Sequence, residues 1–160
     1  VLLFPGAGHR AKQWNLSNFV DIHHRLRQLD IASRFVLGPA ECDRGMEDQL
    51  LSLSRQASFS ITKPESLKQL SEILLTAKAV LGNDSGPMHL AGMLKTPGLV
   101  LFGPTSRSQW GPMGLRSIAS DISCRPCTAS TFNIPCREPE CMSGLNVEKV
   151  WNDFLPFFRP

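Results

Sequence analysis

The sequence has no long apolar run, which excludes a membrane-spanning helix as the basis of its function. No stretch of its 160 residues approaches the roughly 20 apolar residues that such a helix needs. No signal-peptide pattern is visible in the given residues either. The chain has no initiator methionine and opens directly on the strand-like segment Val1-Leu2-Leu3-Phe4. We therefore expect it to be part of a longer polypeptide.

Dense basic clusters and aromatic residues are scarce as well. The formal net charge is only +3 and aromatic residues make up 8% of the chain, which argues against a nucleic-acid-binding module. A mildly basic chain suits a protein that binds a small anion or works near an acidic membrane surface. The sequence contains no D-x-D motif of the kind that binds a metal with a diphosphate, and it has no internal repeat.

Short apolar runs alternate with segments of helical periodicity. We expect strands at residues 1–4, 34–37, 58–61, 79–81 and 99–102, and helices at 16–29, 44–55, 66–74 and 87–94. This alternation predicts one α/β domain with a parallel sheet and helices on both faces. The segment 103–141, rich in Gly, Pro, Ser and Cys, is expected to be mostly loop.

The loop after the first strand allows two modes of phosphate binding. Gly6-Ala7-Gly8-His9-Arg10-Ala11 has the G-x-G-x-x-A spacing of a dinucleotide-binding turn. That turn requires a helix that begins inside it and an acidic residue at the end of the second strand, and neither is found. We favour a glycine loop that approaches an anion, with Lys12 as its charge. An NAD(P)-binding oxidoreductase domain and a plain strand-to-helix loop stay open as alternatives.

The segment GNDSGPMHLA, from Gly82 to Ala91, is the second candidate for anion binding. Asp84 or Ser85 is expected to cap the helix that follows, and His89 shares a helix face with Ser85. A phosphate there would meet the helix dipole, backbone N–H groups, a hydroxyl and an imidazole. In the alternative, both residues only cap the helix and His89 is an ordinary surface residue. Loops that follow parallel strands share one edge, so we expect one combined site.

Three stretches together resemble glycosyltransferase family 9, the heptosyltransferases of lipopolysaccharide core assembly. They are FPGAGHRAKQW, NDSGPMHLA and LVLFGPTSRSQWGPMG, in order across most of residues 1–116. The resemblance implies a Rossmann-like domain, the C-terminal half of a GT-B fold. Residues 1–160 would be the donor-binding domain, with a Cys-rich loop within 117–145 and the N-terminal acceptor domain absent from this chain. Ser106-Arg107 departs from the Asp-Pro that the family often has after the threonine.

The resemblance also implies a set of donor-binding residues. Ala7 and Gly8 would approach the diphosphate through their backbone, and Lys12 would pair with it. Ser85 and Gly86 would donate N–H groups to phosphate, while Asp84 would bind sugar hydroxyls. Glu41 falls where the family has a carboxylate near the nucleoside. The full set is Ala7, Gly8, Lys12, Glu41, Asp84, Ser85, Gly86 and His89.

The activity implied by the resemblance is transfer of a heptose or related sugar from a nucleoside diphosphate, in the first place ADP, to a lipopolysaccharide core acceptor. The partners would be an ADP-heptose-like donor, a lipid-linked or core oligosaccharide acceptor and the missing N-terminal domain, with no nucleic acid. Transfer would need no cofactor and take place in the cytoplasm, including the inner face of the cytoplasmic membrane. The catalytic carboxylate would lie in the N-terminal half. We therefore expect this chain to bind nucleotide without transferring sugar.

The cysteines near the C-terminus follow the pattern C-x2-C-x8-C-x4-C, at Cys124, Cys127, Cys136 and Cys141. Four thiolates suit a structural zinc ion, although the second pair is spaced more loosely than in a usual zinc ribbon. Reduced thiols and disulfides stay open as alternatives. Farther on, Pro156 should bend or end the last helix, and Phe157 and Phe158 beyond it are expected to pack against the absent N-terminal half.

Overall fold

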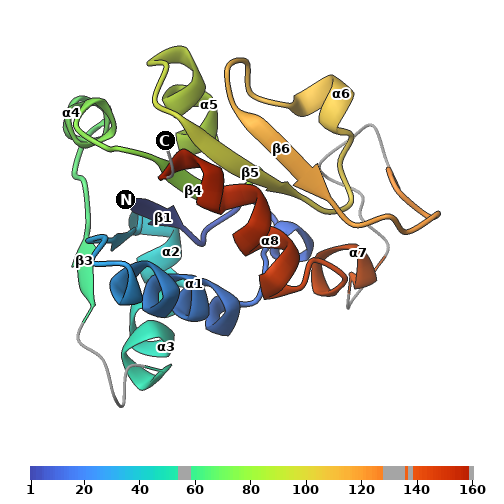
Figure 1. Ribbon diagram of the computed structural model, residues 1–160, viewed down its shortest axis with the longest axis horizontal. Coiled ribbons are helices and arrows are strands. Elements are labelled where there is room, and N and C mark those ends of the chain that lie inside the picture. Colours follow the sequence, from blue (N-terminus) through green and yellow to red (C-terminus); the bar gives the residue numbers. More distant parts are fainter. Residues whose placement is uncertain (54–58, 128–135, 137–138, 159–160) are drawn as a thin grey trace.

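The strands form one six-stranded sheet in which every neighbouring pair is parallel (Figure 1). The computed structural model describes residues 1–53, 59–127, 136 and 139–158. The sheet order is β3-β2-β1-β4-β5-β6. The strands are β1 (Leu2–Phe4), β2 (Arg34–Val36), β3 (Ser60–Thr62), β4 (Val80–Asn83), β5 (Gly98–Phe102) and β6 (Arg116–Ala119).

Successive side chains of the strands point to opposite faces of the sheet and pack in two separate apolar layers. Leu3 pairs in register with Phe35 and Leu81, and all three face the layer formed with α1 (Leu16–Gln28), α3 (Met46–Leu53) and α8 (Val147–Phe154). Leu2 and Phe4 face the opposite layer, formed with α4 (Leu67–Leu75) and α5 (Gly86–Met93). The predicted α/β class, with a parallel sheet and helices on both faces, is confirmed.

The helix boundaries follow local capping chemistry. Asn15 and Ser66 accept hydrogen bonds from the N–H groups of Ser17 and Gln69, which fixes the starts of α1 and α4 as the sequence predicts. Asp30 and Lys95 follow the ends of α1 and α5 with φ values of 55° and 58°. This left-handed conformation, which favours glycine, reverses the chain at the amino edge of the sheet.

Several short elements differ from the sequence expectation. The structure contains β6, α2 (Pro39–Asp43), α6 (Arg107–Trp110) and α7 (Glu140–Ser143), none of which is predicted above. The strand β6 consists of only four residues and gains its hydrogen bonds from pairing with β5. Its sequence Arg-Ser-Ile-Ala lacks the continuous apolar run by which the central strands are predicted.

The C-terminal aromatic residues pack on the chain's own core. The chain leaves α8 through a 3-10 turn, η2 (Leu155–Phe157), in agreement with the predicted effect of Pro156. The rings of Phe157 and Phe158 lie 5.6 Å and 5.1 Å from the fully buried ring of Phe154. Both side chains are only partly buried, so the expectation that they also pack against an absent domain stays a prediction.

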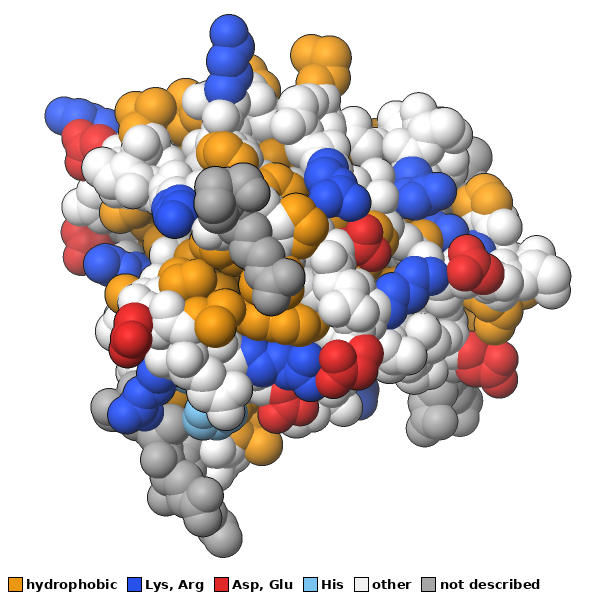
Figure 2. Space-filling model, in the orientation of Figure 1, with side chains coloured by type: hydrophobic (Ala, Val, Ile, Leu, Met, Phe, Trp, Pro, Cys, Tyr) orange, Lys and Arg blue, Asp and Glu red, His pale blue; other side chains and the backbone are white. Residues whose placement is uncertain are grey.

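The face that carries α8 combines an apolar patch with mixed charge. Figure 2 shows hydrophobic side chains gathered in its middle, with acidic and basic side chains interspersed around them. An ion pair between Arg116 and Asp153, at 3.0 Å, joins β6 to α8 on the surface. None of the helices in the described parts of the chain is long and apolar enough to cross a membrane.

The strand order places a crevice between β1 and β4. In a parallel sheet the chain leaves β1 toward one side and β4 toward the other, so the loops that follow them diverge at the carboxyl edge. These are the two loops that carry the glycine turn and the N-D-S-G segment. The fold therefore brings both candidate phosphate loops to one place.

His23 on α1 makes stability depend on pH. Its Nδ1 lies 2.8 Å from the Ser33 hydroxyl, and its buried Nε2 has no hydrogen-bond partner in the described part of the chain. Burial lowers the pKa of His23, and His24 and Arg27 lower it further. His23 therefore binds a proton more readily in the unfolded chain than in the folded one. As the pH decreases below about 6.5, the free energy of unfolding should therefore decrease.

We predict that His23→Gln flattens this dependence. Urea denaturation between about pH 6.5 and pH 5 should show a shallower loss of stability in the variant than in the parent chain, since carboxylates titrate mainly below this range. His24→Gln, one residue along the same helix, serves as the control and should retain most of the loss. Equal slopes in the parent chain and His23→Gln would contradict the assignment.

Candidate functional site

A cavity of about 160 Å³ opens at the carboxyl edge of the sheet, beside the crevice. Its apolar lining includes Phe4, Val36 and Leu70, and its rim is formed by glycine-rich backbone. The remaining lining residues are Gly6, Ala7, Gly8, Gly38, Glu41, Pro64, Ser85, Gly86 and Pro87. An apolar floor beneath a polar rim suits a ligand with one flat apolar part and one charged part.

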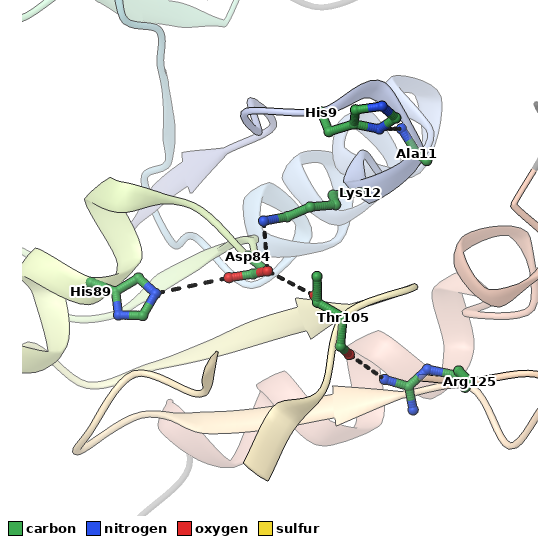
Figure 3. Close-up of polar contacts among 7 residues, drawn as sticks. All are labelled: His9, Ala11, Lys12, Asp84, His89, Thr105 and Arg125. Atoms are coloured by element: carbon green, nitrogen blue, oxygen red, sulfur yellow. Dashed lines mark hydrogen bonds and ion pairs between the residues drawn. The ribbon is translucent and has the colours of Figure 1, made fainter. Parts of the chain in front are cut away.

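The carboxylate of Asp84 joins three loops (Figure 3). Its Oδ2 lies 2.7 Å from the Lys12 ammonium, on the loop after β1, and accepts a 2.8 Å hydrogen bond from the Thr105 hydroxyl, on the loop after β5. The imidazole Nε2 of His89 lies 3.9 Å from Oδ1. Lys12, Asp84 and Thr105 are buried, so this ion pair is poorly screened by solvent.

Asn83, directly before Asp84, provides a second connection between the loops. Its side-chain N–H donates to the Pro5 carbonyl at 2.7 Å, and its Oδ1 accepts from the Trp14 N–H at 3.0 Å. Both bonds are buried and hold the two ends of the loop after β1. No role for Asn83 is predicted from the sequence. The signal that points to it is a polar residue at the end of an apolar strand.

Ser85 occupies the N-cap position of α5 without a side-chain capping bond. Its hydroxyl oxygen is buried and lacks a hydrogen-bond partner among the described residues. The expectation that Asp84 or Ser85 caps α5 is confirmed in position by Ser85, but neither side chain makes a capping bond, and Asp84 is held by Lys12 and Thr105 instead. A Cβ placed on Gly86 or Gly8 would meet no atom within 4 Å, so open space lies in front of both.

The cavity wall opposite α5 is organised by Glu41. Its Oε2 accepts a 3.0 Å hydrogen bond from the Gly38 N–H, and its carboxylate occupies the space that a Cβ on Gly6 would fill. A larger residue in place of Gly6 would therefore displace the Glu41 carboxylate from this position. Arg44, which the sequence analysis does not single out, donates to the Ala7 carbonyl at 3.1 Å and supports the same loop.

The eight sequence-predicted site residues all lie near this edge, in two groups. The cavity itself is lined by Ala7, Gly8, Glu41, Ser85 and Gly86. Lys12, Asp84 and His89 form the adjoining polar cluster and do not line the cavity. Lys12 is engaged with Asp84, so its charge already has a partner.

The four C-terminal cysteines are free thiols that influence one another. Burial and the neighbouring thiols of Cys124 and Cys136 raise the pKa of Cys127, and burial raises the pKa of Cys141. Across residues 1–53, 59–127, 136 and 139–158, no three His, Cys, Asp or Glu side chains are arranged to hold a metal ion. The thiols as placed do not fit a zinc site, and the zinc hypothesis stays a prediction.

Comparisons with known proteins agree on one family. Residues 1–140 match the model of glycosyltransferase family 9 (heptosyltransferase). The lipooligosaccharide heptosyltransferase 2 of Campylobacter jejuni is 30% identical over 153 residues, which cover 92% of this chain and 47% of that protein. Two solved Escherichia coli structures share the fold. One is ADP-heptose lps heptosyltransferase II (TM-score 0.77, 21% identity, 98% of this chain and 45% of that chain). The other is heptosyltransferase WaaC with ADP (TM-score 0.75, 19% identity, 98% of this chain and 43% of that chain).

The fold is that of a Rossmann-like α/β domain of the GT-B type. The chain belongs to glycosyltransferase family 9, because the family model covers most of its length. It spans about half the length of the Campylobacter relatives that it matches. Nothing in these comparisons supports the oxidoreductase alternative.

The Lys12–Asp84 pair gives a prediction for stability. Lys12→Met leaves the buried Asp84 carboxylate without its counter-charge, and such a loss typically costs about 3–5 kcal/mol of stability. The double variant Lys12→Met/Asp84→Asn removes both charges and should recover most of that loss in urea denaturation. Lys63→Met, which breaks an exposed pair with Glu47, serves as the control and should have a much smaller effect. A double variant as unstable as Lys12→Met would refute the pairing.

Proposed function

We propose that this chain is the donor-binding part of a heptosyltransferase that takes ADP-heptose or a closely related nucleoside diphosphate sugar. The observation that carries the proposal is the buried Ser85 hydroxyl, which has no hydrogen-bond partner among the residues that the structure describes and lies at the start of α5 in the cavity lining. A buried hydroxyl without a partner costs free energy, which a bound phosphate oxygen would recover. Family membership gives the class of ligand.

The cavity suits the nucleoside and the helix start suits the diphosphate. Phe4, Val36 and Leu70 offer apolar contacts to a base, and the Glu41 carboxylate keeps Oε1 available to accept from a ribose hydroxyl. At the start of α5, Pro87 has no N–H group and the Met88 N–H donates to the Ser85 carbonyl at 3.1 Å, which leaves the N–H groups of Ser85 and Gly86 to favour an anion. Gly8 and Gly86, both open in front, permit a close approach by the phosphates.

Lys12 would stabilise the leaving diphosphate. An ammonium group has three N–H donors, and Asp84 accepts from one of them at 2.7 Å. We propose that the others reach the diphosphate as its negative charge grows in the transition state, which is the main task in breaking a glycosyl–phosphate bond. Asp84 Oδ1, which is not used by Lys12 or Thr105, would accept from a sugar hydroxyl.

The other half of the reaction belongs to a part of the protein outside this chain. A base must remove the proton from the acceptor hydroxyl, and we propose that an N-terminal acceptor-binding domain supplies its carboxylate. The acceptor would be a lipid-linked or core oligosaccharide of lipopolysaccharide, and the reaction would occur in the cytoplasm, including the inner face of the cytoplasmic membrane. The transfer step in this scheme uses no metal or cofactor from this chain.

We predict that Ser85→Ala weakens ADP binding without weakening the fold. A hydrogen bond to a charged group contributes about 1.5–3 kcal/mol, so calorimetry should show a Kd about 10- to 100-fold higher. Stability in urea should be unchanged or higher, because the hydroxyl has no partner without ligand. The stable variant Lys12→Met/Asp84→Asn should also lose affinity at least several-fold.

Asn146→Ala is the matched control for Ser85→Ala. Asn146 caps α8 on the opposite side of the sheet by accepting from the Lys149 N–H. Its loss should cost about 1 kcal/mol of stability and leave ADP affinity unaltered. If Ser85→Ala binds ADP as tightly as the parent chain, the diphosphate does not lie at α5.

We further predict that the 160-residue chain binds ADP but transfers no heptose from ADP-heptose, since it contributes the leaving-group site and no base. Transfer should appear only when the N-terminal part of the protein is added, covalently or in trans. Release of ADP coupled to acceptor glycosylation is the measurement. Turnover by the chain alone would show that His89 or Asp84 acts as a base.

A further inference from the structure

The loop after β5 is held by a short segment of the Cys-rich region. Arg125 donates from Nε to the Gly103 carbonyl at 2.7 Å and from Nη2 to the Thr105 carbonyl at 3.3 Å. The N–H of Cys127 donates to the Pro104 carbonyl at 2.9 Å. Three consecutive carbonyls of the loop Gly103–Thr105 are therefore bound by residues 125–127.

This same loop carries the hydroxyl that supports Asp84. Thr105 is fully buried, and its side chain donates to Asp84 Oδ2, the oxygen that also faces Lys12. Figure 3 shows the resulting path from Arg125 through Thr105 and Asp84 to Lys12. Each link joins segments far apart in sequence, so the path connects the Cys-rich region to the loop after β1.

The chemistry of Arg125 suits a clamp. A guanidinium has several N–H donors in one rigid plane, so it can bind two carbonyls at once, whereas an ammonium group offers a single donor atom. Its side chain is half-buried against the loop, which limits competition from water. Without it, the carbonyls of Gly103 and Thr105 lose their donors, and the Thr105 hydroxyl loses the support that fixes its direction.

We propose that Arg125 is a positioning residue of the donor site, which acts through Thr105 to hold Asp84 and Lys12 in the geometry that receives a diphosphate. It does not touch the ligand. The inference rests on the proposed function for its effect on ADP, but the coupling between the loops is a property of the chain without ligand. It therefore predicts two separate effects, one on affinity and one on backbone protection.

The first test is ADP titration calorimetry on a double-mutant cycle. Arg125→Ala and Thr105→Val should each raise the Kd for ADP about 3- to 10-fold. The Kd of the double variant should not exceed the higher of the two single-variant values, because both substitutions interrupt the same chain of contacts from Arg125 to Asp84. Arg125→Lys should recover part of the loss. Arg116→Ala removes a like charge at the amino end of β6 and should have no effect. Parent-like affinity in Arg125→Ala, or additive losses in the double variant, would overturn the proposal.

The second test is hydrogen exchange without ligand. Arg125→Ala should speed exchange at residues 103–106 and also at residues 12–14, whose Lys12 and Gln13 N–H groups are bonded to His9 and Arg10 carbonyls. A purely local role would change only the first segment, and that result would overturn the proposal. If the parent chain does not bind ADP, the proposed function fails, and hydrogen exchange still decides whether Arg125 acts on Lys12.

Discussion

The site depends on the contacts that the buried carboxylate of Asp84 makes with Lys12 and Thr105. A carboxylate that has left water must be neutralised and hydrogen-bonded, and its two close partners come from different loops. The loops after β1, β4 and β5 are therefore connected by electrostatic contacts in addition to the apolar packing of side chains such as Trp14. Asn83 makes a similar connection without charge, because its side-chain amide donates to the Pro5 carbonyl and accepts from the Trp14 N–H.

This arrangement separates rigid groups from groups that await a ligand. Asn83, the Thr105 hydroxyl and the Oδ2 atom of Asp84 have close partners within the chain, whereas the nearby Ser85 hydroxyl has none among the described residues. Preorganised donors favour a ligand because little reorganisation is needed when it binds.

Much of the fold could be predicted from the sequence because its signals are local. Apolar runs gave the central strands, and Asn15 and Ser66 gave helix starts through capping bonds between residues two or three apart. The strand β6 was not predictable in this way, since its hydrogen bonds depend on β5 rather than on its own composition. Parallel topology also placed the candidate loops at one edge.

The partners within the site could not be predicted with the same certainty. The sequence identifies Lys12 and Asp84 as charged residues on loops, but their ion pair depends on β1 and β4 being neighbours in the sheet. The roles of Arg44 and Arg125 depend on backbone carbonyls, which every residue has and no sequence pattern marks. Side chains that bind backbone are thus the least visible part of such a site.

The left-handed turns at Asp30 and Lys95 have a consequence for how this domain can change over evolutionary time. Both lie where helices return to the amino edge of the sheet, at the opposite end of the strands from the candidate site. A non-glycine residue adopts this left-handed backbone conformation at a cost in conformational free energy that glycine does not have. Substitution of glycine at Asp30 or Lys95 could therefore raise the stability of the domain without changing the opposite end of the strands, which carries the candidate site.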